Sequence, residues 1–174
     1  MTTQIVGKLA NEVVTSLKVK TKQDVMKAPT TNPEAYEFYL KAKHKYSKRE
    51  NIEDTEIARG LLNKSIELDD NLLVAKVLLG TTYREMGDYD KAMEIFTPAL
   101  KLAVEFNDKS GMAAILNSIG SVYHYKGGYE KTFDYYERSL AIQEELGDKR
   151  GMGVSLGNIG LIHIYKGDND TALD

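Results

Sequence analysis

Side chains that could catalyse a reaction or bind a metal are scattered along this 174-residue chain, without the spacing that such chemistry needs. The histidines, His44, His124 and His163, form no metal-ligand pattern with one another or with neighbouring carboxylates. No serine or threonine lies in a nucleophile elbow, and no glycine-rich segment has the pattern of a phosphate-binding loop. The absence of cysteine excludes thiol chemistry. The sequence therefore predicts no catalytic residue, no metal and no cofactor, and we expect a protein that is not an enzyme.

Tyrosine is the one residue type of possible functional interest that gathers in a short segment. Tyrosine is enriched at binding surfaces, but it also fills helix interfaces. The five clustered residues are Tyr123, Tyr125, Tyr129, Tyr135 and Tyr136. Their surroundings must therefore decide between a binding role and a packing role.

Charge divides the chain into a basic and an acidic part. Residues 1–49 carry 10 Lys and Arg against 4 Asp and Glu, whereas residues 50–174 carry 13 against 22. The basic blocks around Lys18 to Lys22 and Lys41 to Arg49 could contact phosphates, but a solvated linker and a charged helix face explain them as well. No apolar run approaches the ~18 residues of a membrane-spanning helix. We expect neither nucleic acid nor membrane as a partner, and a cytoplasmic location, which suits a chain without cysteine.

Glycines repeat along the chain with a constant spacing. Gly80, Gly120 and Gly160 are 40 residues apart, and a second glycine follows each of them by seven residues. Residues 111–134 and 151–174 share 9 identities in 24 positions. This regularity indicates an internal duplication.

Within each copy the apolar residues have the period of an α-helix. Leu72, Ala75 and Leu79 mark one stripe, and Gly87 then breaks the helix with Asp88 placed to cap the next one. Each copy is therefore predicted to be a helical hairpin, and hairpins must stack to bury their apolar faces. The sequence predicts an all-α fold.

The run from Leu79 to Leu100, L-G-x-x-Y…G-x-Y-x-K-A…F-x-x-A-L, resembles the tetratricopeptide signature. This resemblance implies a right-handed superhelical solenoid of stacked antiparallel hairpins, with Gly80 and Ala92 where two helices approach closely. The usual repeat has about 34 residues. The 40-residue variety resembles arrays that hold extended partner peptides in signalling complexes.

The resemblance also implies a domain organisation. The run TNPEAYEFYLKAKHKYSKR is similar to the first repeat of arrays attached to bacterial nucleotide cyclases and related signalling proteins, which implies an upstream domain. An amphipathic helix is also predicted in residues 1–18, and it either docks on the first repeat or belongs to such a domain. The expected parts are an amphipathic helix in 1–18, a polar linker in 19–31 and an array in 32–174, divided into a degenerate repeat (32–70), two repeats (71–110 and 111–150) and a truncated repeat (151–174).

In this family the first helix of each repeat lines a concave groove that binds a peptide or a partner domain. The matching positions are Val77, Thr81, Arg84, Asn117, Ser121, His124, Tyr125, Asn158, Leu161 and Tyr165. The amides of Asn117 and Asn158 could bond both groups of a peptide backbone, although solvated polar positions are the alternative. Tyr125 and Tyr165 are expected to be exposed, whereas Tyr123, Tyr129 and Tyr136 occupy packing positions.

A clamp for a C-terminal carboxylate is not expected in this groove. Such a clamp uses two lysines, an arginine and two asparagines, and none of the positions that the resemblance matches to them holds a lysine or arginine here. These positions are Val77, Thr81, Ser118, Val154 and Asn158.

The last repeat suggests an alternative function. Its helix is apolar on nearly all sides, which predicts burial on two faces. We therefore expect Leu156, Ile159 and Ile162 to mediate self-association, with a homodimer formed through the open C-terminal end.

Overall fold

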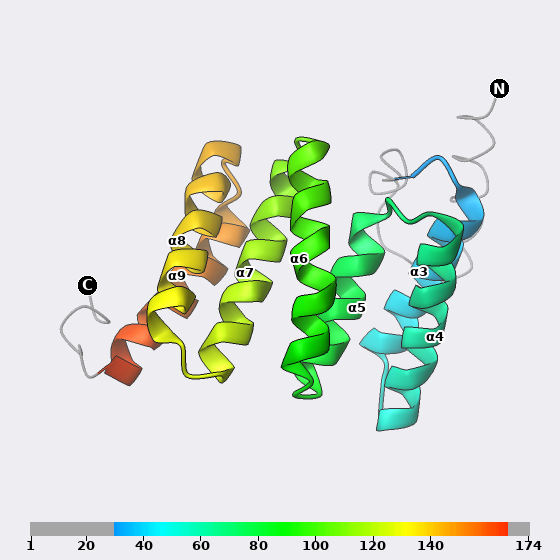
Figure 1. The fold of residues 1–174 in the computed structure, drawn as a ribbon, viewed down its shortest axis with the longest axis horizontal. Coiled ribbons are helices and arrows are strands. Elements are labelled where there is room, and N and C mark those ends of the chain that lie inside the picture. The colour runs from blue at the N-terminus through cyan, green and yellow to red at the C-terminus, as the bar shows by residue number, and fades with distance from the viewer. Residues whose placement is uncertain (1–29, 167–174) are drawn as a thin grey trace. The chain divides into compact units, whose positions relative to one another are not determined.

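The computed structural model describes residues 30–166, and every regular element in this range is an α-helix, as predicted. The helices are α3 (Pro33–Ser47), α4 (Ile52–Leu68), α5 (Leu73–Glu85), α6 (Tyr89–Glu105), α7 (Lys109–Tyr125), α8 (Tyr129–Leu146) and α9 (Lys149–Lys166) (Figure 1). They belong to two compact units, Met1–Thr82 and Tyr83–Asp174, whose boundary falls inside α5. The predicted N-terminal helix, the linker up to residue 29 and residues 167–174 lie outside the described range.

In the first unit, α3 and α4 form a hairpin whose ends are tied by side chains. Asn32 caps α3 by accepting the backbone N–H groups of Glu34 and Ala35, and Pro33 occupies the first helical turn, where its missing N–H costs nothing. The Asn32 Nδ2 donates to the Leu68 carbonyl at 2.8 Å, and the Ser65 hydroxyl donates to the Ala35 carbonyl at 2.7 Å. These bonds fix the start of α3 against the end of α4.

A buried arginine joins α4 to the part of α5 that lies in the same unit. Arg59 is 8% exposed, and its Nε and Nη2 donate to the hydroxyl and the carbonyl of Thr82 at 3.0 and 2.9 Å. Glu56 accepts from its Nη1. The charge of Arg59 is therefore matched and its donors are used, as a buried cation requires.

In the second unit, a residue with left-handed backbone stands at each turn between helices. The φ angle is 81° at Gly87, 76° at Gly127, 65° at Gly147 and 51° at Asn107. Helices commonly end on such a residue, for which glycine has no Cβ penalty. The predicted helix breaks at Gly87 and Gly127 are confirmed, and the Asp88 carboxylate accepts the Lys91 N–H as the predicted cap of α6.

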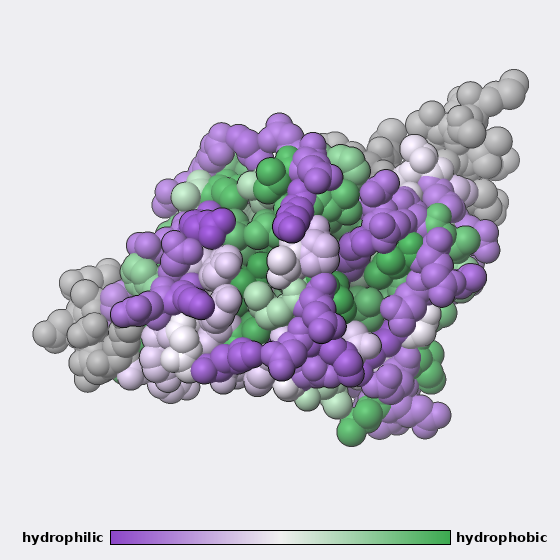
Figure 2. Space-filling model, in the orientation of Figure 1, coloured by the Kyte–Doolittle hydropathy of each residue, from purple (hydrophilic) through white to green (hydrophobic). Residues whose placement is uncertain are grey.

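Close packing of α7 against α8 forms the centre of the second unit. Ile115, Leu116, Ile119 and Val122 are at most 2% exposed. None of the helices within residues 30–166 is long and apolar enough to cross a lipid bilayer. Figure 2 shows one face of the molecule, where hydrophobic residues reach the surface among hydrophilic ones.

Candidate functional site

The predicted groove residues fall on α5, α7 and α9, the first helices of successive hairpins, and are divided between the two units. Val77 and Thr81 lie in the first unit, where both are half-buried and the Thr81 hydroxyl donates to the Val77 carbonyl at 2.8 Å. The remaining eight lie in the second unit, and we call them the first-helix face: Arg84, Asn117, Ser121, His124, Tyr125, Asn158, Leu161 and Tyr165.

Aromatic rings gather at one end of the first-helix face. The ring of His124 lies 5.4, 6.0 and 5.3 Å from the rings of Tyr125, Tyr129 and Tyr165. Tyr125 also stacks on Tyr89 at 5.7 Å with an interplanar angle of 7°. Tyr125 and Tyr165 are 63% and 58% exposed, so their predicted exposure is confirmed. We call these five residues the aromatic cluster.

The packing roles of three other tyrosines are confirmed only in part. Tyr136 is buried, as predicted. Tyr123 is half-buried and stacks on Tyr135 at 5.5 Å, and Tyr129 is half-buried within the aromatic cluster. Sequence reasoning missed Tyr89 as a member of this cluster, although its 40-residue offset from Tyr129 was a usable signal.

The two asparagines predicted to bind a peptide backbone lie next to each other. Asn158 Nδ2 donates to Asn117 Oδ1 at 3.4 Å, and Asn117 Nδ2 donates to the Ser155 hydroxyl at 3.2 Å. The Asn117 amide therefore makes one hydrogen bond through its nitrogen and one through its oxygen inside the protein. Asn158 is half-buried, and its Oδ1 accepts no hydrogen bond from the described residues.

A row of polar side chains continues from Asn117 into the interior. Ser155 donates to Gln143 Oε1 at 2.8 Å, Gln143 Nε2 donates to the Ser139 hydroxyl at 3.1 Å, and that hydroxyl donates to the Ala113 carbonyl at 2.8 Å. Ser155 and Ser139 are fully buried. These contacts link α7, α8 and α9. The sequence offered one hint, since Ser139 stands where the preceding copy has Ala99.

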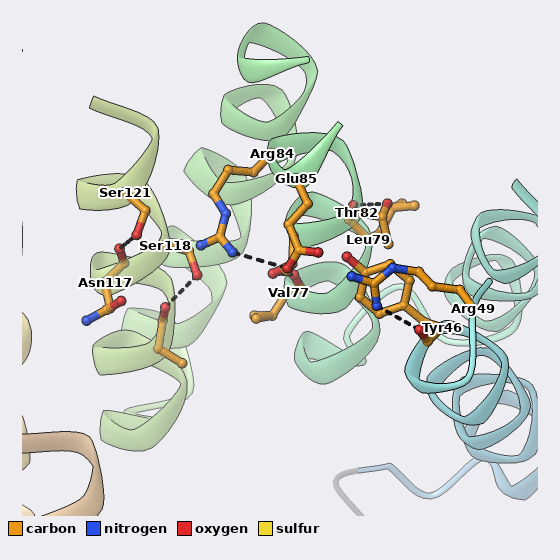
Figure 3. A network of polar contacts seen from close by, with 12 residues as sticks. Tyr46, Arg49, Val77, Leu79, Thr82, Arg84, Glu85, Asn117, Ser118 and Ser121 are labelled. Carbon is orange, nitrogen blue, oxygen red and sulfur yellow. Dashed lines mark hydrogen bonds and ion pairs between the residues drawn. The ribbon is translucent and has the colours of Figure 1, made fainter. Parts of the chain in front are cut away.

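At the start of the second unit, Arg84 extends from α5 toward α7. Figure 3 shows its guanidinium pointing toward Ser118, and its Nη2 lies 3.5 Å from Glu85 Oε1. The Ser121 hydroxyl lies 3.1 Å from the Tyr136 hydroxyl. Burial raises the pKa of Tyr136, while the hydrogen bond to Ser121 and the charge of Arg84 oppose this shift. Arg84 is thus near a pair of hydroxyl groups on α7 and α8.

The predicted self-association residues differ in exposure. Leu156 is 52% exposed and Ile159 is half-buried, but Ile162 is only 1% exposed. The expectation that Ile162 offers an accessible surface is therefore wrong. Ile162 lies seven residues after the buried Ser155, on the side of α9 that packs against α8. The large apolar residues of α9 that are exposed are Val154, Leu156, Leu161, Ile164 and Tyr165.

Potential metal ligands are not clustered in the part of the chain that the structure describes. The His163 ring instead meets the Phe133 ring edge-on at 5.5 Å. His163 of α9 therefore packs against Phe133 of α8.

The stacked hairpins define a helical-repeat protein. A family model described as tetratricopeptide repeat matches residues 71–145 and 111–174, which together make up more than half of the chain. The chain belongs to the tetratricopeptide repeat family.

Solved structures with the same fold share little sequence with this chain. BtubC from P. vanneervenii is 16% identical and superposes with a TM-score of 0.73 over 96% of this chain and 76% of that chain. A MamA structure is 24% identical, with a TM-score of 0.58 over 82% and 74% of the two chains. MamA 41-end from Desulfovibrio magneticus RS-1 is 14% identical, with a TM-score of 0.60 over 99% and 89%. No curated protein matches the chain by sequence.

Proposed function

We propose that this chain is a non-catalytic scaffold that binds an extended peptide, or an extended segment of a partner domain, on its first-helix face. The observation that carries the proposal is the aromatic cluster, where Tyr125 and Tyr165 remain more than half exposed. Exposed tyrosines with stacked neighbours offer rigid contact area, and such residues dominate the energy of many interfaces.

Polar groups near the aromatic cluster favour a ligand with an extended peptide backbone. Asn158 offers an acceptor for a peptide N–H, and Leu161 is 42% exposed between Asn158 and Tyr165 on α9. A peptide that crosses α7 and α9 could thus satisfy backbone groups while its side chains contact the rings. We expect an affinity on the order of micromolar, since ordering the peptide offsets much of the buried area.

The proposed wider role rests on sequence features rather than on the first-helix face. The 40-residue repeat and the similarity of residues 31–49 to cyclase-associated arrays support a part of a larger signalling or regulatory protein. The division of 32–174 into four repeats, the absence of nucleic-acid and membrane partners and a cytoplasmic location belong to the same proposal.

Selection from a library of random linear peptides tests the proposed function. The intact chain should select peptides that bind with micromolar affinity in calorimetry. Replacing Tyr125 and Tyr165 by alanine should weaken this binding roughly tenfold or more, because exposed aromatic anchors are lost. The control is Phe106→Ala, which removes a 55% exposed ring at the end of α6. Equal binding by all three proteins would contradict the proposal.

Self-association is a second candidate, supported by the exposed apolar side chains of α9. Val154, Leu156 and Ile164 are each more than half exposed, an arrangement that often marks an interface. Light scattering across a concentration series should then show a dimer, which Leu156→Asp should dissociate. Ile162→Asp is unsuitable, because it would place a charge in the interior. A monomer at every concentration would refute this candidate.

A further inference from the structure

Two buried side-chain nitrogens within residues 30–166 lack a hydrogen-bond partner, Arg84 Nε and His124 Nδ1. They are 40 residues apart, and each lies four residues after the repeated glycine, Gly80 or Gly120. The same position of two successive repeats therefore carries an unsatisfied polar group. Buried polar groups without partners are rare and costly, so their recurrence at one position of the first-helix face calls for an explanation.

Arg59 shows how the same residue type is accommodated when its role is structural. Its Nε and Nη2 both donate to Thr82, and Glu56 accepts from Nη1. The ion pair of Arg84 is much weaker, since the adjacent Glu85 lies 3.5 Å away and Nε has no acceptor. The Arg84 side chain keeps 19% of its surface exposed, so the residue is not closed off from solvent.

The chemistry of these groups defines the missing partner. The planar guanidinium donates two parallel hydrogen bonds to a carboxylate, which Glu85 does not accept in this geometry. Phosphate groups are usually recognised by clusters of arginines, whereas Arg84 is the only lysine or arginine in the first-helix face. A single carboxylate is therefore the matching anion.

We infer that the peptide proposed above carries an aspartate or glutamate that binds Arg84, and that His124 forms a further hydrogen bond to the same peptide. This inference rests on the proposed function. The bound carboxylate takes over from Glu85 and pairs with the guanidinium, and the peptide runs from there across the aromatic cluster that surrounds His124.

Peptides selected by the intact chain test this inference. Each binding peptide is resynthesised with its Asp replaced by Asn or its Glu by Gln, and both forms are titrated into the wild type and Arg84→Gln by calorimetry. We expect an acidic residue in the selected peptides and a loss of about tenfold in affinity on its neutralisation. Arg84→Gln should cause a similar loss, and neutralising the peptide should then have little further effect, because both changes remove one interaction.

Three further variants and a folding test separate a binding role from a structural one. Lys101→Gln makes the same change of charge at an exposed site on α6 and should bind like the wild type. Arg84→Lys keeps the charge but loses the planar fork, so it should bind more weakly than the wild type. Circular dichroism should show that Arg84→Gln folds normally, and His124→Phe, which keeps a ring, should weaken binding severalfold.

The outcomes distinguish this inference from the proposed function. If no peptide is selected, the proposed function fails and the inference fails with it. If the selected peptides lack an acidic residue, or bind equally well after its neutralisation, only the inference is refuted. Binding of phosphoserine peptides but not of their aspartate counterparts would likewise overturn the carboxylate assignment.

Discussion

Gly120 of α7 lies so close to Tyr136 of α8 that a Cβ atom on the glycine would be 2.8 Å from two carbons of the tyrosine ring. The Tyr136 ring is 3% exposed and its hydroxyl meets Ser121, so it has little freedom to move. The glycine is therefore required by this contact. Its backbone φ is not unusual.

We predict that Gly120→Ala destabilises the protein by about 1–3 kcal/mol, because overpacking outweighs the better helix propensity of alanine. Chemical denaturation measures the change. The matched control is Gly160→Ala at the equivalent position of α9, where a Cβ meets nothing within 4 Å. It should stabilise the protein by about 0.5–1 kcal/mol. The same effect at both positions would contradict the packing explanation.

Pro98 provides a prediction of the opposite sign. It is exposed inside α6, and the helix continues through it although proline cannot donate to the carbonyl of Glu94. Pro98→Ala should raise the free energy of unfolding by about 1–3 kcal/mol, because the missing backbone hydrogen bond is restored. Part of this gain is offset, because proline also restricts the unfolded chain and the variant loses that restriction. A melting temperature of Pro98→Ala below that of the wild type would contradict this prediction. It would show that the contacts of the proline ring outweigh the missing hydrogen bond.

Removal of the Ser155 hydroxyl should expose the cost of the buried polar row. Ser155→Ala leaves Gln143 Oε1 and Asn117 Nδ2 without their common partner, so we expect a loss of about 1–3 kcal/mol. Ser47→Ala removes an exposed hydroxyl at the end of α3 and should change stability by less than about 0.5 kcal/mol. Urea denaturation of both variants compares the two sites. Equal losses in the two variants would mean that the buried polar row stabilises the protein no more than an exposed hydroxyl does.

The pH dependence of stability should reveal the raised pKa of Tyr39. Burial, aided by the nearby Tyr36, raises its pKa from 10.0 to about 12. Above pH 10 the unfolded chain releases this proton while the folded protein retains it, so stability is lost between pH 10 and pH 12, by roughly 2 kcal/mol in total. Tyr39→Phe cannot titrate and should lack this part of the decline. An identical pH profile for both proteins would refute the shift.

Sequence periodicity was sufficient to predict helices and the breaks between them at Gly87 and Gly127. The residue type of Gly87 predicts a left-handed turn. The spacing of Leu72, Ala75 and Leu79 predicts a helix. The exposure of Tyr125 and Tyr165 could be predicted because the repeat assigns each position a side of the hairpin. Local spacing and residue type carry this information without any knowledge of tertiary contacts.

The properties that depend on a third helix were harder to predict. Ile162 and Leu156 are both apolar residues of α9, and only the packing of α8 decides that the first is buried and the second exposed. Likewise, the sequence marked Asn117 as a polar groove residue, but its bond to Ser155 depends on how α9 lies against α7. Hydrogen-bond satisfaction is a property of three-dimensional neighbours, so the unpaired nitrogens of Arg84 and His124 could not be recognised from residue type.

The hydrogen bonds that run from Asn158 through Asn117 to Ser155 give the surface of this array a connection to its interior. A ligand group that draws the Asn117 amide away from Ser155 also removes a contact of the Ser155 hydroxyl, whose other contacts are with Gln143 and Ser139. Occupation of the surface and cohesion between neighbouring hairpins therefore share one set of bonds. A change in hydrogen exchange around the buried residues Ser139 and Gln143 of α8 would therefore report an event at the Asn158 amide, without any movement of a domain.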